Sequence, residues 1–169
     1  CQALLQRLEV RERMQDRING MLSLEQPVCD LVTAGVEALC AEAAHSEVGD
    51  EMKARLANLL RLLQERDVAT QRCEVLISHP IAELTVDVVN THLVEAVRCC
   101  VGSALLERCR QVLIRVTRRD DLQLRLQAVL DQPIYELRSI DIRTLLNDEA
   151  AAGVAAGVIA DCQALLQRL

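Results

Sequence analysis

Apolar residues recur at three- and four-residue spacing through most of this 169-residue chain, which is the period of an amphipathic α-helix. One such seam runs through Met52, Leu56, Leu59 and Leu63, with polar residues between its members. Short polar or glycine-containing segments interrupt the pattern. The pattern predicts helices over 1–22, 27–46, 50–77, 80–99, 103–130, 133–147 and from about 149 to the end.

The three prolines mark a repeat. Pro27, Pro80 and Pro133 are spaced 53 residues apart, and each stands where a predicted helix begins, a position at which a missing N–H costs little. Each is followed by an apolar residue, by an acid three residues on and by a leucine four residues on. We expect the acid in the first helical turn, where it interacts favourably with the helix dipole. These positions are Asp30, Glu83 and Glu136, and Leu31, Leu84 and Leu137.

A shift of 53 residues aligns more than the prolines. Segments 27–79 and 80–132 share twelve identities without a gap, among them the pairs Arg66-Asp67 and Arg119-Asp120. The pair Arg11-Glu12 joins the same column once two extra residues are allowed in the 23–26 segment. A period of this length is typical of stacked helical units.

The two ends of the chain carry the same octamer, Cys-Gln-Ala-Leu-Leu-Gln-Arg-Leu, at 1–8 and 162–169. We interpret it as the start of a second copy of a 161-residue super-repeat, although an engineered duplication would give the same sequence. The chain is then one array over 1–169: the end of a preceding repeat (1–26), repeats 27–79 and 80–132, and a truncated repeat 133–169. We expect both ends to self-associate, through Leu4, Leu5, Leu8, Leu165, Leu166 and Leu169.

Two-residue connections before Pro80 and Pro133 require successive helices to be antiparallel neighbours. The predicted fold is all-α, with tandem antiparallel helical hairpins of about 53 residues stacked as an elongated α-solenoid or a helical bundle. In this organisation the chain resembles α-solenoid proteins as a class, and its long period resembles that of giant cytoskeletal array proteins. It lacks the tetratricopeptide and ankyrin signatures, and its period exceeds that of HEAT or armadillo units.

The composition limits which residues can form the core and which classes of partner the chain can bind. One tyrosine and no phenylalanine or tryptophan leave a core of aliphatic residues, which suits long helices packed side by side. The net charge of −6, without a basic run, argues against nucleic acid or an anionic membrane as a partner. No run of about 18 apolar residues is present, so membrane insertion is not expected.

Eight cysteines and three histidines are the candidate chemical groups. Five cysteines share columns with apolar residues, where a free thiol behaves as a small hydrophobe, and this favours a reducing, cytoplasmic location. The adjacent pair Cys99-Cys100 leaves a redox or inter-chain role open. His79 and His92 share columns with connection and core residues, and His45 is expected to be exposed. No catalytic, cofactor-binding or metal site is therefore assigned.

The arginine of the recurring Arg-acid pair falls on the apolar seam of its helix, at Arg11, Arg66 and Arg119. An arginine there could bind a partner along one face of the array. It could instead form an ion pair between elements, with the acid that follows the proline, and its repetition in every unit favours this structural role.

No nucleotide-binding, metalloprotease or hydrolase motif is present. The sequence therefore favours a non-catalytic structural segment of a tandem-repeat protein, with a cytoskeletal setting as one expectation. Such a segment acts as a spacer or a self-associating rod, and its partners are neighbouring repeats and further copies. The alternative is a protein–protein interaction module that binds a peptide or a helix on one solenoid face.

Overall fold

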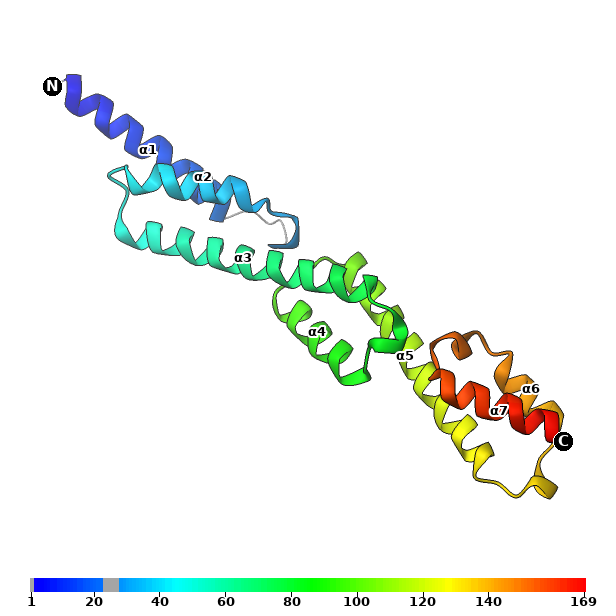
Figure 1. The fold of residues 1–169 in the computed structure, drawn as a ribbon. Helices are drawn as coiled ribbons and strands as arrows, with labels where there is room; N and C mark the ends of the chain where they lie inside the picture. The colour runs from blue at the N-terminus through cyan, green and yellow to red at the C-terminus, as the bar shows by residue number, and fades with distance from the viewer. Residues whose placement is uncertain (1, 23–27) are drawn as a thin grey trace. The chain divides into compact units, whose positions relative to one another are not determined.

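The computed structural model describes residues 2–22 and 28–169, and only the backbone of Ala3, Cys29 and Ala150. This part of the chain is all-α, as predicted, and contains no strand (Figure 1). Its elements are α1 (Gln2–Leu22), η1 (Val28–Asp30), α2 (Thr33–Ala44), α3 (Asp50–Ser78), η2 (Ile81–Glu83), α4 (Val86–Arg98), α5 (Ser103–Leu130), η3 (Ile134–Glu136), α6 (Ser139–Leu146), η4 (Glu149–Gly153) and α7 (Ala156–Arg168), where η denotes a 3₁₀-helix.

The starts of the elements recur at a constant spacing. The 3₁₀-helices η1, η2 and η3 begin at residues 28, 81 and 134, and the helices after them begin at 33, 86 and 139. Helices α3, α5 and α7 begin at 50, 103 and 156, again 53 residues apart. Burial follows the same spacing, with at most 1% exposure at Val36, Val89 and Ile142 and at Leu56, Cys109 and Cys162.

The predicted starts of the shorter helices at the prolines are wrong. Pro80 and Pro133 have ψ angles of 133° and 136°, outside the helical region, and each precedes a 3₁₀-turn instead of an α-helix. Leu84 and Leu137 then run extended, with ψ angles of 147° and 143°, so the turn cannot continue into the helix. The acid therefore closes a 3₁₀-turn. Pro27 lies outside the described residues.

The last predicted helix also begins later than expected. Its alanine-rich start at 149–153 forms η4, and α7 begins only at Ala156, seven residues beyond the predicted start. By contrast, α3 and α5 match their predicted spans to within one residue. Acids at the start of α3, Asp50 and Glu51, suit the positive end of its helix dipole.

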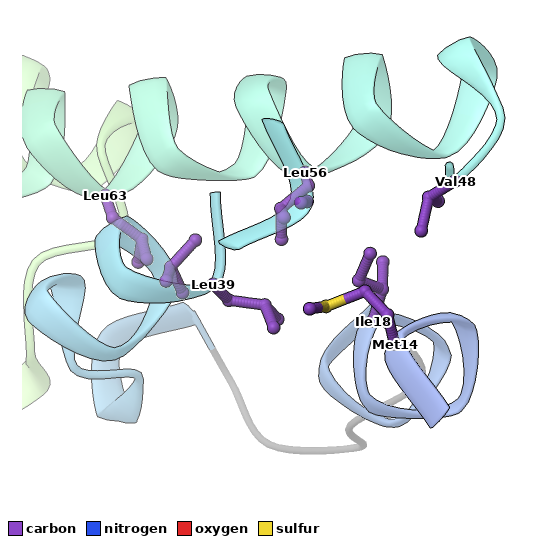
Figure 2. Close-up of a cluster of buried hydrophobic side chains, with 8 residues drawn as sticks. Met14, Ile18, Leu39, Val48, Leu56 and Leu63 are labelled. Atoms are coloured by element: carbon purple, nitrogen blue, oxygen red, sulfur yellow. The ribbon is translucent and has the colours of Figure 1, made fainter. Parts of the chain in front are cut away.

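The chain divides into two compact units, one formed by residues 1–71 and 95–103 and the other by 72–94 and 104–169. In the first unit, α1 and α2 pack against the early part of α3. Figure 2 shows Leu56 and Leu63 of α3 pointing toward side chains of α1 and α2. The core cluster consists of Met14, Ile18, Val36, Leu39, Ala43, Val48, Leu56 and Leu63.

In the second unit, α6 and α7 pack on the later part of α5. Leu126, Ile142 and Cys162 are fully buried there, one from each of the three helices. The complete cluster also holds Leu122, Leu145 and Val154. Each core is built from aliphatic and sulfur-containing residues, in keeping with the composition.

Candidate functional site

The recurring arginines reach back to the 3₁₀-turns that follow the prolines. Arg119, in the middle of α5, is only 7% exposed. Its Nη1 donates a hydrogen bond to the main-chain oxygen of Ile81, and its Nη2 donates to that of Leu84 at 2.9 Å. Asp120 accepts from its Nε at 2.8 Å and from its Nη2 at 2.5 Å. We call this arrangement the arginine–turn contact: a guanidinium held by two turn carbonyls and by the carboxylate of the next residue.

Arg66 makes the arginine–turn contact in the first unit. Its Nη1 donates to the main-chain oxygens of Val28 at 2.6 Å and Leu31 at 2.7 Å. Asp67 accepts from its Nε at 2.9 Å and from its Nη2 at 2.6 Å. Every partner stands 53 residues before the corresponding partner of Arg119. The two contacts are therefore the same arrangement formed twice.

One polar side chain is added at Arg66. Thr33 accepts a hydrogen bond from the guanidinium at 3.1 Å and donates one to Asp67. Burial by itself would raise the pKa of Asp67, but the hydrogen bonds from Thr33 and Arg66 and the arginine charge outweigh it, so this pKa lies below its usual value. Val86 holds the position equivalent to Thr33 near Arg119, where no hydroxyl is available.

The carboxylates that pair with the two arginines are not the ones that the repeat pattern suggested. Among the described residues, the carboxylate that pairs with each arginine is the next residue, Asp67 or Asp120, and not the acid of the turn. A guanidinium carries five N–H donors in a planar fork, so one side chain can serve two carbonyls and a carboxylate together. The arrangement connects a long helix to a 3₁₀-turn earlier in the chain, through main-chain atoms of the turn.

Gly153 in η4 provides room for this contact. A Cβ at this glycine would lie 3.2 Å from Cγ and Cδ of Arg119 and 3.4 Å from Cγ2 of Ile81. The sequence contains no signal for this role, because the equivalent positions hold Glu47 and Cys100. A cavity of about 350 Å³ adjoins the contact, lined by Pro80, Ile81, Ala82, Arg115, Arg118, Arg119, Glu149, Ala152 and Gly153.

Arg11, the third arginine of the column, lies half-buried on α1. Its Nε is buried and has no hydrogen-bond partner in the described part of the chain. It lines a groove of about 430 Å³, together with Gln6, Arg7, Val10, His45, Ser46 and Glu47.

The leucines near the two ends lie in different surroundings. Leu165 and Leu166 are half-buried against the core of the second unit. The others are exposed: Leu4 at 63%, Leu5 at 58%, Leu8 at 37% and Leu169 at 45%.

The histidines and cysteines do not gather into a site in the described residues, where no group of three or more metal-ligating side chains occurs. His45 and His79 are exposed, whereas His92 is half-buried and its Nδ1 has no partner in this part of the chain. The described free cysteines are Cys40, Cys73, Cys99, Cys100, Cys109 and Cys162.

Within the described chain, no helix combines the length and the apolar character needed to cross a membrane. Comparisons with models of known families, with curated proteins and with solved structures found no match.

Proposed function

We propose that this chain is a non-catalytic structural segment built from tandem helical hairpins of about 53 residues, stacked in the manner of an α-solenoid. It acts as a spacer or scaffold whose length follows the number of repeats. The observation that carries this proposal is the arginine–turn contact, which occurs at Arg66 and again at Arg119 with equivalent partners.

The contact suits a structural repeat because it connects a long helix to a turn in the preceding part of the chain. The arginine extends from the middle of a 28- or 29-residue helix and holds the turn through which the preceding hairpin reverses. Separating the long helix from the turn breaks hydrogen bonds from a charged donor, each worth about 1.5–3 kcal/mol. If successive units each form this contact, their stabilisation energies add up along the array.

The proposed setting is the cytoplasm, with an association with the cytoskeleton as the more specific form of the proposal. Support comes from the free thiols at Cys73, Cys109 and Cys162, which are at most 1% exposed. Such thiols fill core volume and are compatible with a reducing compartment. The proposed partners are neighbouring repeats and further copies of the chain.

Small-angle scattering combined with light-scattering mass tests the proposal. The samples are this chain and a chain of two 161-residue periods. An array predicts that the maximum dimension nearly doubles while both samples keep their monomeric mass. If the longer chain is instead compact, with a radius of gyration close to that of one globule, the array proposal is wrong and each period is a closed bundle.

The second candidate is an interaction module that binds a peptide or helix on one face. Exposed apolar side chains on α4 favour the interaction module: Val88 is 45% exposed and Val94 is 70% exposed. Substituting both with serine separates the candidates. The array proposal expects the dimensions of the two-period chain to stay unchanged, whereas the module requires a lost binding activity in a chain that remains folded.

A further inference from the structure

The cavity beside Arg119 belongs entirely to the second unit, since every residue that lines it lies within 72–94 or 104–169. Its volume of about 350 Å³ is in the range of small-ligand sites. The lining combines two kinds of residue. Three arginines of α5 and one acid, Glu149, supply its charged groups. The remaining residues are apolar or small: Pro80, Ile81, Ala82, Ala152 and Gly153.

The three arginines, Arg115, Arg118 and Arg119, stand three and four residues apart, so they share one face of α5. Like charges at this spacing repel each other and destabilise the helix. Only Arg119 has a close carboxylate, that of Asp120 at 2.5 Å. Arg118 is 64% exposed and lies 3.9 Å from Asp148. Arg115 is exposed and has no hydrogen-bond or ion-pair partner among the described residues.

The arginine–turn contact does not require the two exposed arginines. In the first unit, the positions equivalent to Arg115 and Arg118 hold Leu62 and Glu65, and Arg66 makes the same contact there. Neither exposed arginine packs into the core of its own unit. Residues that oppose the stability of their own helix without a structural gain are typical of functional sites.

Arg119 itself has an unused donor. A guanidinium carries five N–H groups, and that of Arg119 makes four hydrogen bonds, to the oxygens of Ile81 and Leu84 and twice to Asp120. At least one N–H therefore has no acceptor in the described part of the chain. This side chain lines the cavity although the residue is only 7% exposed, so a ligand oxygen in the cavity is a suitable acceptor.

The lining selects the chemistry of the ligand. Three guanidinium groups and one carboxylate give the cavity an excess of positive charge, which favours an anion. A carboxylate accepts two parallel hydrogen bonds from one guanidinium. The charge of Glu149 disfavours an anion with two negative charges, such as phosphate. The apolar residues suit an aliphatic group beside the carboxylate. Glu149, which has no partner among the described residues, is a suitable acceptor for a main-chain N–H.

We propose that this cavity binds an acidic peptide segment of a partner protein, in which an aspartate or glutamate stands beside an aliphatic residue. Arg115 and Arg118 donate hydrogen bonds to the carboxylate of the segment, and its aliphatic side chain contacts Ile81 and Ala152. Glu149 accepts from its main chain. This inference goes beyond the proposed spacer function, because it assigns a partner-binding site to the second unit. It uses a different surface from the valines of α4.

Fluorescence anisotropy of a labelled peptide tests the site. The probe is a fluorescein-labelled peptide, Gly-Leu-Glu-Leu-Asp-Gly, with an amidated carboxyl end. The comparison peptide has Gln and Asn in place of Glu and Asp. We expect the acidic peptide to bind at least about tenfold more tightly than the neutral one and to weaken as salt is added. Arg115→Gln should weaken its binding at least about tenfold, because a hydrogen bond from a charged donor is lost.

Arg125→Gln is the matched control. Arg125 is 60% exposed on the same helix, 4.0 Å from Asp121, and it does not line the cavity. The two variants change the net charge equally, so Arg125→Gln should leave the affinity unchanged. Urea unfolding separates binding from a structural role. Arg115→Gln should leave the unfolding midpoint unchanged or raise it, because it removes repulsion within α5. A lowered midpoint would mean that Arg115 stabilises the fold, and the proposal would be wrong.

Three binding results would also overturn the proposal. The acidic peptide binds no more tightly than the neutral one, or Arg115→Gln and Arg125→Gln weaken binding equally, or inorganic phosphate or a phosphoserine peptide binds where the acidic peptide does not. The outcome is separate from that of the spacer proposal. Arg115→Gln should not change the dimensions of the two-period chain, and a compact two-period chain that still binds the acidic peptide would refute only the spacer.

Discussion

Replacing Arg119 with methionine tests how much the arginine–turn contact contributes to stability. Methionine keeps an apolar stem beside Gly153 and Ile81, but it loses the donors to the oxygens of Ile81 and Leu84. A hydrogen bond from a charged donor contributes about 1.5–3 kcal/mol. The two bonds to main-chain oxygens are lost together with the partly exposed pair to Asp120, and part of their energy returns because a guanidinium no longer has to be desolvated. We expect a net loss of about 3 kcal/mol, or a fall of roughly 6–12 °C in Tm for a chain of this size.

Urea unfolding followed by circular dichroism measures this loss, and the neighbouring arginine provides the control. Arg118 is 64% exposed and lies 3.9 Å from Asp148, so Arg118→Met should cost less than about 0.5 kcal/mol. Arg66→Met should resemble Arg119→Met, because it removes the same contact from the first unit. If Arg119→Met costs no more than Arg118→Met, the contact does not hold the hairpin turn and the mechanism proposed for the array fails.

Three further predictions concern residues around the contacts. Gly153→Ala should lower the free energy of unfolding in urea by about 1–2 kcal/mol, because the added Cβ crowds the aliphatic part of the Arg119 side chain. Gly157→Ala should be neutral or stabilising, because the space around Gly157 is open. Equal effects of the two substitutions would contradict this reasoning. Cys100→Gly should stabilise by about 1 kcal/mol, since Cys100 holds a left-handed φ of 57° at the end of α4; a loss in thermal unfolding would refute it. The lowered pKa of Asp67 means that its stabilisation is present above about pH 4 and is lost as the pH falls through its folded-state pKa, so the cost of Asp67→Asn should be largest at neutral pH and should decrease as the pH is lowered through that pKa. A cost independent of pH would show that the charge of Asp67 is not involved.

The sequence predicted the long helices better than the short ones, for a physical reason. The apolar seams of helices α3 and α5 continue on both sides of Arg66 and Arg119, so periodicity alone locates these helices. The segment after each proline also has apolar residues, but after Pro80 and after Pro133 it forms a 3₁₀-turn followed by an extended leucine. The turn after Pro133 has this conformation without an arginine contact in the described residues. Apolar spacing of three to four residues fits a 3₁₀-turn as well as the start of an α-helix, so periodicity placed the helix starts too early.

The candidate site was predictable in position but not in chemistry. Repeat alignment identified the arginine column, and a charged residue on an apolar seam has to find partners. The partners themselves are main-chain atoms and an adjacent acid, which no spacing rule indicates. The role of Gly153 could not be predicted for a related reason. This glycine leaves space for the side chain of Arg119, and no sequence pattern indicates such space.

The dependence of the contact on main-chain oxygens has a consequence for how such repeats can diverge. The arginine binds main-chain oxygens of the turn and not its side chains, and the two turns that it binds read Val-Cys-Asp and Ile-Ala-Glu. Mutations in a turn can therefore accumulate without a compensating change in the long helix, provided that the backbone keeps its course. The two turns can therefore differ in all three side chains while the long helix keeps the same arginine and the same acid for both contacts.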